Sequence, residues 1–169
     1  MIAVNYSSLR NNMKDYLNLV TEECETLLIN RSRADTNVLV VSEESYENLQ
    51  EVLHLLESFS NHQWLQQSEE QLANGQVHIM QDMQKPVIFS ENAWQDYARW
   101  ESEDKRILRK LDSFLGDITG GSNAASGRSR PLQGELRGCW SRRLNEKDRL
   151  VYRMDAENVY VLACRYHDR

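Results

Sequence analysis

The chain has 169 residues, the length of one average domain or two small ones. Hydrophobic residues make up 40% and charged residues 27%, a globular mix that excludes wholesale disorder and fibrous repeats. The longest apolar run, residues 38–41, is far too short to span a membrane, and the N-terminus lacks the basic start and apolar core of a signal peptide. Because Cys24, Cys139 and Cys164 form no CxxC pair, we expect reduced thiols in a cytoplasmic protein, with no metal site and no cofactor.

The net charge of −6 is divided unevenly along the chain. Residues 1–83 carry 4 basic and 13 acidic side chains, whereas residues 84–169 carry 16 basic and 13 acidic ones. Eight of these bases fall within residues 128–153, which hold only three acids. The asymmetry suggests two modules that attract each other, the second of them suited to a polyanion. An uneven surface without a function is the alternative.

Residues 1–58 predict a β-α-β-β-α unit. A strand at 2–5 leads into a helix capped by Ser7 and Ser8, whose apolar residues recur at helical spacing as far as Val20. Two β-rich runs, 26–30 and 37–41, flank a hairpin loop, and Ser42 opens a second helix. A unit of this size is marginal alone and would gain from dimerisation.

Residues 59–83 differ in kind, because a few apolar side chains are spread among Gln, Asn, Ser and Glu. Such a stretch has too few apolar residues for a core of its own, so we expect it to fold on a partner, although a plain amphipathic surface helix fits the spacing as well. Residues 74–85 then form a linker that ends at a module boundary. The predicted anchors are Phe59, Trp64, Leu65 and Leu72.

Residues 84–169 predict an α+β module with two helices on an antiparallel sheet. A strand at 87–89 is followed by a Ser90 cap and two amphipathic helices, then by a Gly/Ser/Ala-rich loop over 117–129. Strand-like runs follow at 139–144, 149–154 and 158–165, with a shorter run at 132–136.

The basic strands carry the chemistry that residue types alone can indicate. Arg149 lies on one strand and His167 just after the last one, whereas no Ser-His-Asp order, phosphate loop or metal-ligand cluster is visible. Cleavage of RNA through its 2′-OH needs a base, cations for the phosphorane and an acid for the leaving 5′-oxygen. A histidine can perform either proton transfer, although a lone histidine near a C-terminus is more often incidental.

Three motifs in order give the stronger argument: GCWSRR at 138–143, DRLVY at 148–152 and ACRYH at 163–167. Together with the opening VIFSENAWQDYARWESEDKRILRK, they resemble the YoeB branch of the RelE-type toxins. Residues 1–83 resemble the Phd/YefM antitoxins, through a Tyr-Ser…Arg start, LLINR and VLVVSEESY. The whole chain is therefore similar to an antitoxin fused to its toxin, as in type II toxin–antitoxin systems.

The resemblance implies roles for matching positions. The toxin half would be an endonuclease that cleaves mRNA on the ribosome, with Arg149 stabilising phosphate and His167 as general acid, while Arg142 and Arg143 contact the RNA backbone. The antitoxin half would be a homodimer that binds operator DNA. Residues 59–83 would neutralise the toxin within the chain or by exchange between two chains. The DNA-binding candidates are Arg10, Arg31 and the neighbouring Arg33.

Two positions depart from the family. Arg130 stands before Pro131 where the family has a Glu, and Asp168 follows His167 where the family has a terminal Tyr. An arginine stays protonated and cannot replace a carboxylate base, so we expect an attenuated or inactive nuclease. The alternatives are a DNA-binding autorepressor with a dead toxin-like domain and, with less support, a nuclease that works without the ribosome.

Overall fold

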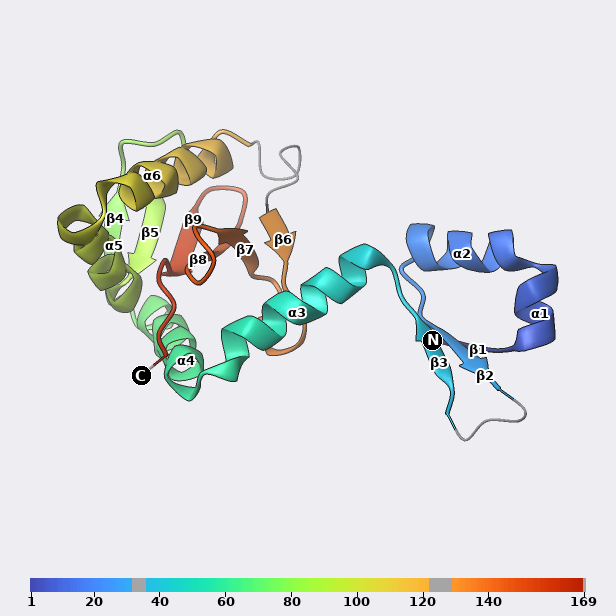
Figure 1. The fold of residues 1–169 in the computed structure, drawn as a ribbon. Coiled ribbons are helices and arrows are strands. Elements are labelled where there is room, and N and C mark those ends of the chain that lie inside the picture. The colour runs from blue at the N-terminus through green and yellow to red at the C-terminus, as the bar shows by residue number, and fades with distance from the viewer. Residues whose placement is uncertain (32–35, 122–128, 169) are drawn as a thin grey trace. The chain divides into compact units, whose positions relative to one another are not determined.

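The computed structural model describes residues 1–31, 36–121 and 129–168, which divide into two compact units, 1–50 and 51–169 (Figure 1). The boundary between the compact units follows residue 50, and the functional boundary predicted between residues 58 and 59 stays a prediction. No helix in the described part of the chain is long and apolar enough to cross a membrane.

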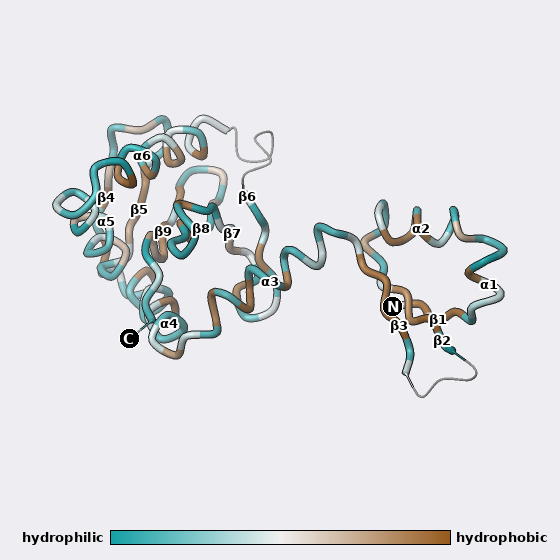
Figure 2. The backbone as a smooth tube through the Cα atoms, viewed as in Figure 1, coloured by the Kyte–Doolittle hydropathy of each residue, from teal (hydrophilic) through white to brown (hydrophobic). Residues whose placement is uncertain are grey.

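The first unit is a three-stranded sheet with two helices in the connection between its first two strands. Strand β2 (Leu27–Asn30) lies in the centre, parallel to β1 (Ile2–Asn5) and antiparallel to β3 (Val38–Val40). Figure 2 shows these strands as largely hydrophobic. The expected order of elements is confirmed, and helix α3 (Glu43–Glu57) starts at Ser42, whose Oγ accepts the Ser45 N–H at 3.1 Å.

The predicted first helix is interrupted. It forms α1 (Tyr6–Asn11) and α2 (Met13–Glu22), because Asn12 has φ −129° and ψ 36° and leaves the helical region. Its cap is Asn5, whose side chain accepts the Ser8 N–H at 2.7 Å, and not the predicted serines.

The second unit is built on a six-stranded sheet in the order β4-β5-β9-β8-β7-β6. All pairs are antiparallel except β5–β9, so the sheet is mixed and not wholly antiparallel as expected. The α+β class itself is confirmed. The strands are β4 (Val77–Met80), β5 (Val87–Ser90), β6 (Ser129–Pro131), β7 (Trp140–Arg143), β8 (Arg149–Met154) and β9 (Val159–Ala163).

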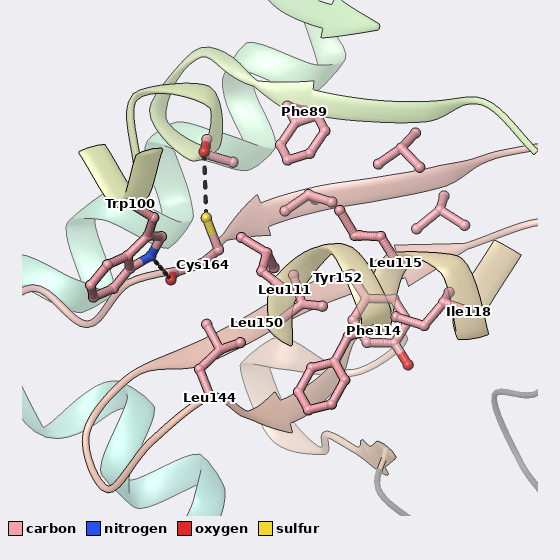
Figure 3. Close-up of a cluster of buried hydrophobic side chains, with 14 residues drawn as sticks. Phe89, Trp100, Leu111, Phe114, Leu115, Ile118, Leu144, Leu150, Tyr152 and Cys164 are labelled. Atoms are coloured by element: carbon pink, nitrogen blue, oxygen red, sulfur yellow. Dashed lines mark hydrogen bonds between the residues drawn. The ribbon is translucent and has the colours of Figure 1, made fainter. Parts of the chain in front are cut away.

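Helices α5 (Glu91–Glu103) and α6 (Lys105–Thr119) cover one face of the sheet. Their buried side chains pack with those of β5, β8 and β9 in a single cluster (Figure 3). The Trp100 indole donates to the Cys164 carbonyl at 2.8 Å, tying the end of α5 to the chain just after β9. Burial raises the pKa of the Cys164 thiol well above its usual range.

The opposite face of the sheet is covered by α4 (Phe59–Ala73) and by the end of α3. A second core joins Leu55 and Leu65 from these helices to Val151 and Leu162 from the sheet. The Ser68 hydroxyl donates to the Leu162 carbonyl at 2.6 Å in the interior. The segment that was expected to need a partner therefore finds it in residues 87–168 of its own chain.

Three local expectations are corrected. Residues 77–80, expected within the linker, form β4 along the edge of β5, and Gly75 ends α4 with φ +73°. The run at 132–136 contains the 3₁₀ turn η1 (Gly134–Leu136) in place of a strand. The predicted loop starting at residue 117 begins later, because α6 continues to Thr119, and its residues 122–128 lie outside the described part.

The predicted anchors differ in burial, and this supplies a stability test. Leu65 is 1% exposed and packs in the second core, whereas Phe59 is 73% exposed and does not anchor the segment. We expect Leu65→Ala to lower the free energy of unfolding by about 2–5 kcal/mol, because it leaves a cavity between helix and sheet. Phe59→Ala should change it by less than about 0.5 kcal/mol. Urea unfolding of the two variants makes the measurement, and equal losses would contradict the described packing.

Candidate active site

The Arg149 guanidinium is the most deeply buried cation on the face covered by α3 and α4. The side chain is 3% exposed. Its Nη1 donates to three carbonyls in the turn before β8, those of Asn145, Glu146 and Asp148, at 3.0–3.3 Å. These carbonyls satisfy hydrogen bonds but supply no negative charge, so the guanidinium still needs an anion.

Glu51, on the last two turns of α3, is that anion. Its Oε1 accepts the Arg149 Nε–H at 2.7 Å and the Ser141 hydroxyl at 2.6 Å. Glu51 and Ser141 are both buried, so this is an interior ion pair with a hydroxyl as a third member. The contact places a carboxylate where a cationic site would receive a phosphate oxygen.

His167 is held on the same face by α4. Its ring stacks on Trp64 with the ring centroids 3.9 Å apart. Its backbone is fixed from both sides: the N–H donates to Asn61 Oδ1 at 3.0 Å, and the carbonyl accepts the Ser58 hydroxyl at 2.6 Å. Ser58 is the N-cap of α4, so the first two turns of this helix bind the C-terminal segment of the chain.

Asp96 of α5 fixes the His167 ring from the other side. Its Oδ1 lies 2.9 Å from His167 Nε2, and its Oδ2 accepts the Cys164 N–H at 3.2 Å. The carboxylate has no solvent exposure, and burial raises its pKa, against the opposing effect of the hydrogen bond with His167. A buried carboxylate of this kind fixes the orientation of an imidazole.

Arg149 and His167 are brought to one end of the sheet through their sequence neighbours. Asp148, which precedes Arg149, accepts the backbone N–H of Tyr166 at 2.9 Å. The Tyr166 ring stacks on His54 of α3, whose Nε2–H donates to the Lys147 carbonyl at 2.9 Å. The two predicted catalytic residues therefore lie on adjoining segments, and both are covered by α3 and α4.

Strand alternation separates the two predicted RNA-binding arginines. Arg143 is exposed, whereas Arg142 points to the α6 side and is 0% exposed. Arg142 Nε donates to Ser129 at 2.5 Å, and its guanidinium lies 5.2 Å from the centre of the Phe114 ring. The Arg142 side chain is thus part of the core, and the RNA contact predicted for it stays a prediction.

The two departures from the family lie on different segments of the chain. Arg130, on β6, is paired in register with Ser141 of β7. Asp168 forms an exposed ion pair with Lys147 at 2.6 Å. Arg130 and Asp168 both stay candidate site residues.

The remaining contacts of α4 are mostly polar. His62 lies 2.9 Å from Glu135, and Arg153 lies 3.2 Å from Glu69, both near the surface. Among the predicted anchors other than Phe59, Trp64 covers His167, Leu65 is buried in the second core, and Leu72 packs against it.

The predicted DNA-binding residues lie in the first unit. Arg10 is in the last turn of α1, and Arg31 follows β2; both are exposed. Arg33 lies outside the described residues.

Sequence reasoning missed Glu51, Ser141 and Asp96. The signals were present but weak: Glu51 stands one helical turn before the core residue Leu55, and Asp96 shares an inward stripe with Ala93 and Trp100. A polar residue at an inward position indicates a buried partner without identifying it. The partners of these three residues are identified only once the helices are packed on the sheet.

Comparison with known proteins gives two family matches along the chain. Residues 89–168 match the family of YoeB-like toxins of bacterial type II toxin–antitoxin systems, and residues 1–75 match the Phd/YefM antitoxins of such systems. Toxin YoeB of Escherichia coli is 40% identical over 81 residues, which cover 48% of this chain and 96% of that protein. Toxin RelK of Mycobacterium tuberculosis is 39% identical over 83 residues, 49% of this chain and 98% of that one.

Among solved structures, the heterotetrameric YoeB-YefM complex of Staphylococcus aureus matches with 33% identity and a TM-score of 0.45, over 48% of this chain and 94% of that chain. The family matches define the class of protein as a bacterial type II toxin–antitoxin system. The chain belongs to the YoeB-like toxin family, and residues 1–75, ahead of the toxin region in the same polypeptide, match the Phd/YefM antitoxins. The recognition made from the motifs is confirmed.

The buried ion pair predicts an asymmetry between two acidic residues of the antitoxin half. We expect Glu51→Ala to lower the free energy of unfolding by about 3–5 kcal/mol, because it leaves the buried Arg149 without an anion. Glu69→Ala, which removes an ion pair whose two side chains are each 41% exposed, should cost less than about 1 kcal/mol. Denaturant unfolding compares them, and a cost for Glu51→Ala no larger than that for Glu69→Ala would contradict the assigned contact.

Proposed function

We propose that the chain is a self-neutralised toxin–antitoxin fusion. Its toxin half is a YoeB-type endonuclease that acts on mRNA at the ribosome, in the cytoplasm, and its antitoxin half keeps that site covered. The supporting observation is that Glu51 and Trp64, both from the antitoxin half, lie against Arg149 and His167. An RNA phosphate cannot reach the Arg149 Nε while the Glu51 carboxylate is bound there.

In the uncovered toxin the reaction would be transesterification at the RNA backbone. The 2′-oxygen gives its proton to a solvent water and bonds to phosphorus, and the bond from phosphorus to the 5′-oxygen breaks, which leaves a 2′,3′-cyclic phosphate. Arg149 stabilises the negative charge of the phosphorane, and His167 protonates the departing 5′-oxygen. Asp96 orients the imidazole.

The chain lacks the family's base for the first proton transfer, because Arg130 stands at that position. The loss of one proton-transfer group commonly costs about 10²–10⁴-fold in rate. We therefore propose a toxin that is attenuated as well as covered. We propose further that neutralisation occurs within one chain, which the contact between Glu51 and Arg149 supports.

Bacterial growth and cleavage of a reporter mRNA test this proposal in the full chain. The unchanged protein should leave growth normal, and the double variant Glu51→Gln, Trp64→Ala should arrest growth weakly. Adding Arg130→Glu to the double variant should produce strong arrest, with cuts inside translated codons, because the base is restored. Adding Arg149→Ala should abolish both effects. If the folded, soluble variants with Arg130→Glu leave the reporter intact, the nuclease proposal is wrong.

The second proposed function is binding of operator DNA by the antitoxin half, with the toxin-like half as a passive module. The exposed Arg10 and Arg31 and the departure at Arg130 favour it. A homodimer would present these arginines twice and would bury apolar side chains that the first unit leaves exposed. These side chains are Met13, Leu17, Leu39, Val41, Tyr46 and Leu49.

The two arginines give a test of DNA binding that is independent of nuclease activity. With the DNA directly upstream of the gene as probe, Arg10→Ala and Arg31→Ala should each weaken binding and flatten its salt dependence by about one phosphate contact per protomer. The exposed Arg106 of α6 supplies the control, and Arg106→Ala should leave the affinity unchanged. An unchanged salt dependence in both variants would argue against these residues as phosphate contacts.

A further inference from the structure

Residue 130 lies on the sheet face that receives the Glu51 carboxylate. Arg130 is directly opposite Ser141 in the β6–β7 register, and residues opposite each other in an antiparallel pair project from the same face. The Ser141 hydroxyl donates to Glu51 Oε1 at 2.6 Å. The neighbouring pair, Ser129 and Arg142, is hydrogen-bonded on the other face, as the alternation requires.

The arginines on this face belong to three neighbouring strands. Arg149 of β8 binds Glu51 directly at 2.7 Å, and Arg143 of β7 is opposite Arg149 in register. Arg130 approaches Ser141 from the outer strand, with cross-strand Cβ atoms about 5 Å apart in such a pair. Three neighbouring strands therefore each place an arginine on the sheet face to which the antitoxin helix brings a carboxylate.

We propose that Arg130 is a specificity-determining residue of the antitoxin–toxin contact. Its positive charge favours an antitoxin helix with a carboxylate at position 51, and an acidic residue at 130 would repel that helix. The inference rests on the proposed function for its biological meaning, since it assigns to Arg130 a part in neutralisation. Its physical content is a coupling between the charges at 51 and 130.

The experiment is a double-variant cycle in the full chain. Arg130→Glu and Arg130→Gln are each made with Glu51 present and with Glu51→Gln, and hydrogen exchange of residues 51–57 is followed by mass spectrometry. With Glu51 present, these amides should exchange at least about tenfold faster in Arg130→Glu than in Arg130→Gln, because Arg130→Glu sets two like charges against each other whereas Arg130→Gln leaves position 130 uncharged. With Glu51→Gln, that difference should largely disappear. Arg130→Lys, which keeps the charge, should exchange like the unchanged chain.

Two controls keep the result interpretable. Arg106 lies on the opposite side of the sheet and is 89% exposed, and its substitutions change the net charge by the same amount as those of Arg130. The amides of residues 51–57 should therefore exchange at the same rate in Arg106→Glu as in Arg106→Gln. If Arg130→Glu does not fold, the cycle is run on Arg130→Gln alone, whose difference from the unchanged chain should vanish when Glu51→Gln is added.

If the substitutions at residue 130 change the exchange rate of residues 51–57 equally with and without the Glu51 charge, the inference is wrong. This measurement needs no RNA, ribosome or growth assay. A failure of every variant to cleave mRNA would count against the proposed nuclease and leave the charge coupling intact. Growth arrest on uncovering without any coupling would refute only the role of Arg130.

Discussion

Burial of the Arg149 guanidinium is the constraint on which the covered site depends. An arginine keeps its proton, so it cannot escape burial by becoming neutral, and an unpaired charge in the interior costs several kcal/mol. Backbone carbonyls satisfy one side of the group, and within the described part of the chain Glu51 is the acid that pairs with it. The end of α3 therefore completes the interior at the start of β8. The positive group that would stabilise phosphate in the uncovered toxin is also the group that binds the antitoxin helix.

The helices that cover the second face of the sheet are joined to the toxin fold by the chain itself and by packing. Residues 51–80 run along the second face of the sheet as the end of α3 and as α4, and then add β4 to its edge. His78 of β4 contacts Glu91 at 2.6 Å and stacks on Trp94, and the hydrogen bond lowers the pKa of the Glu91 carboxyl. A segment attached in this way has an effective concentration of about millimolar even when it detaches, so it rebinds readily.

The functional asymmetry of the sheet follows from strand alternation. Along β7, Ser141 and Arg143 project to the side of α3 and α4, while Arg142 projects into the core beside Phe114. The adjacent arginines of one motif therefore lie on opposite faces of the sheet, one exposed and one buried. The bonds of Arg142 to Ser129 and Asp117 tie the outer strand and α6 together. This tie supports β6, the strand that carries Arg130.

The sequence by itself determined the order of most elements and the family, because apolar periodicity, caps and spaced motifs are local properties. It also indicated that residues 59–83 need a partner, since their composition cannot bury a core. The tertiary structure decided which residues meet: Glu51 with Arg149, Trp64 with His167, and Asp96 with the same imidazole. It also moved Arg142 from the predicted RNA surface to the interior and made an edge strand from part of the expected linker. These outcomes depend on register and on helix packing between residues up to about a hundred positions apart, which no local pattern encodes.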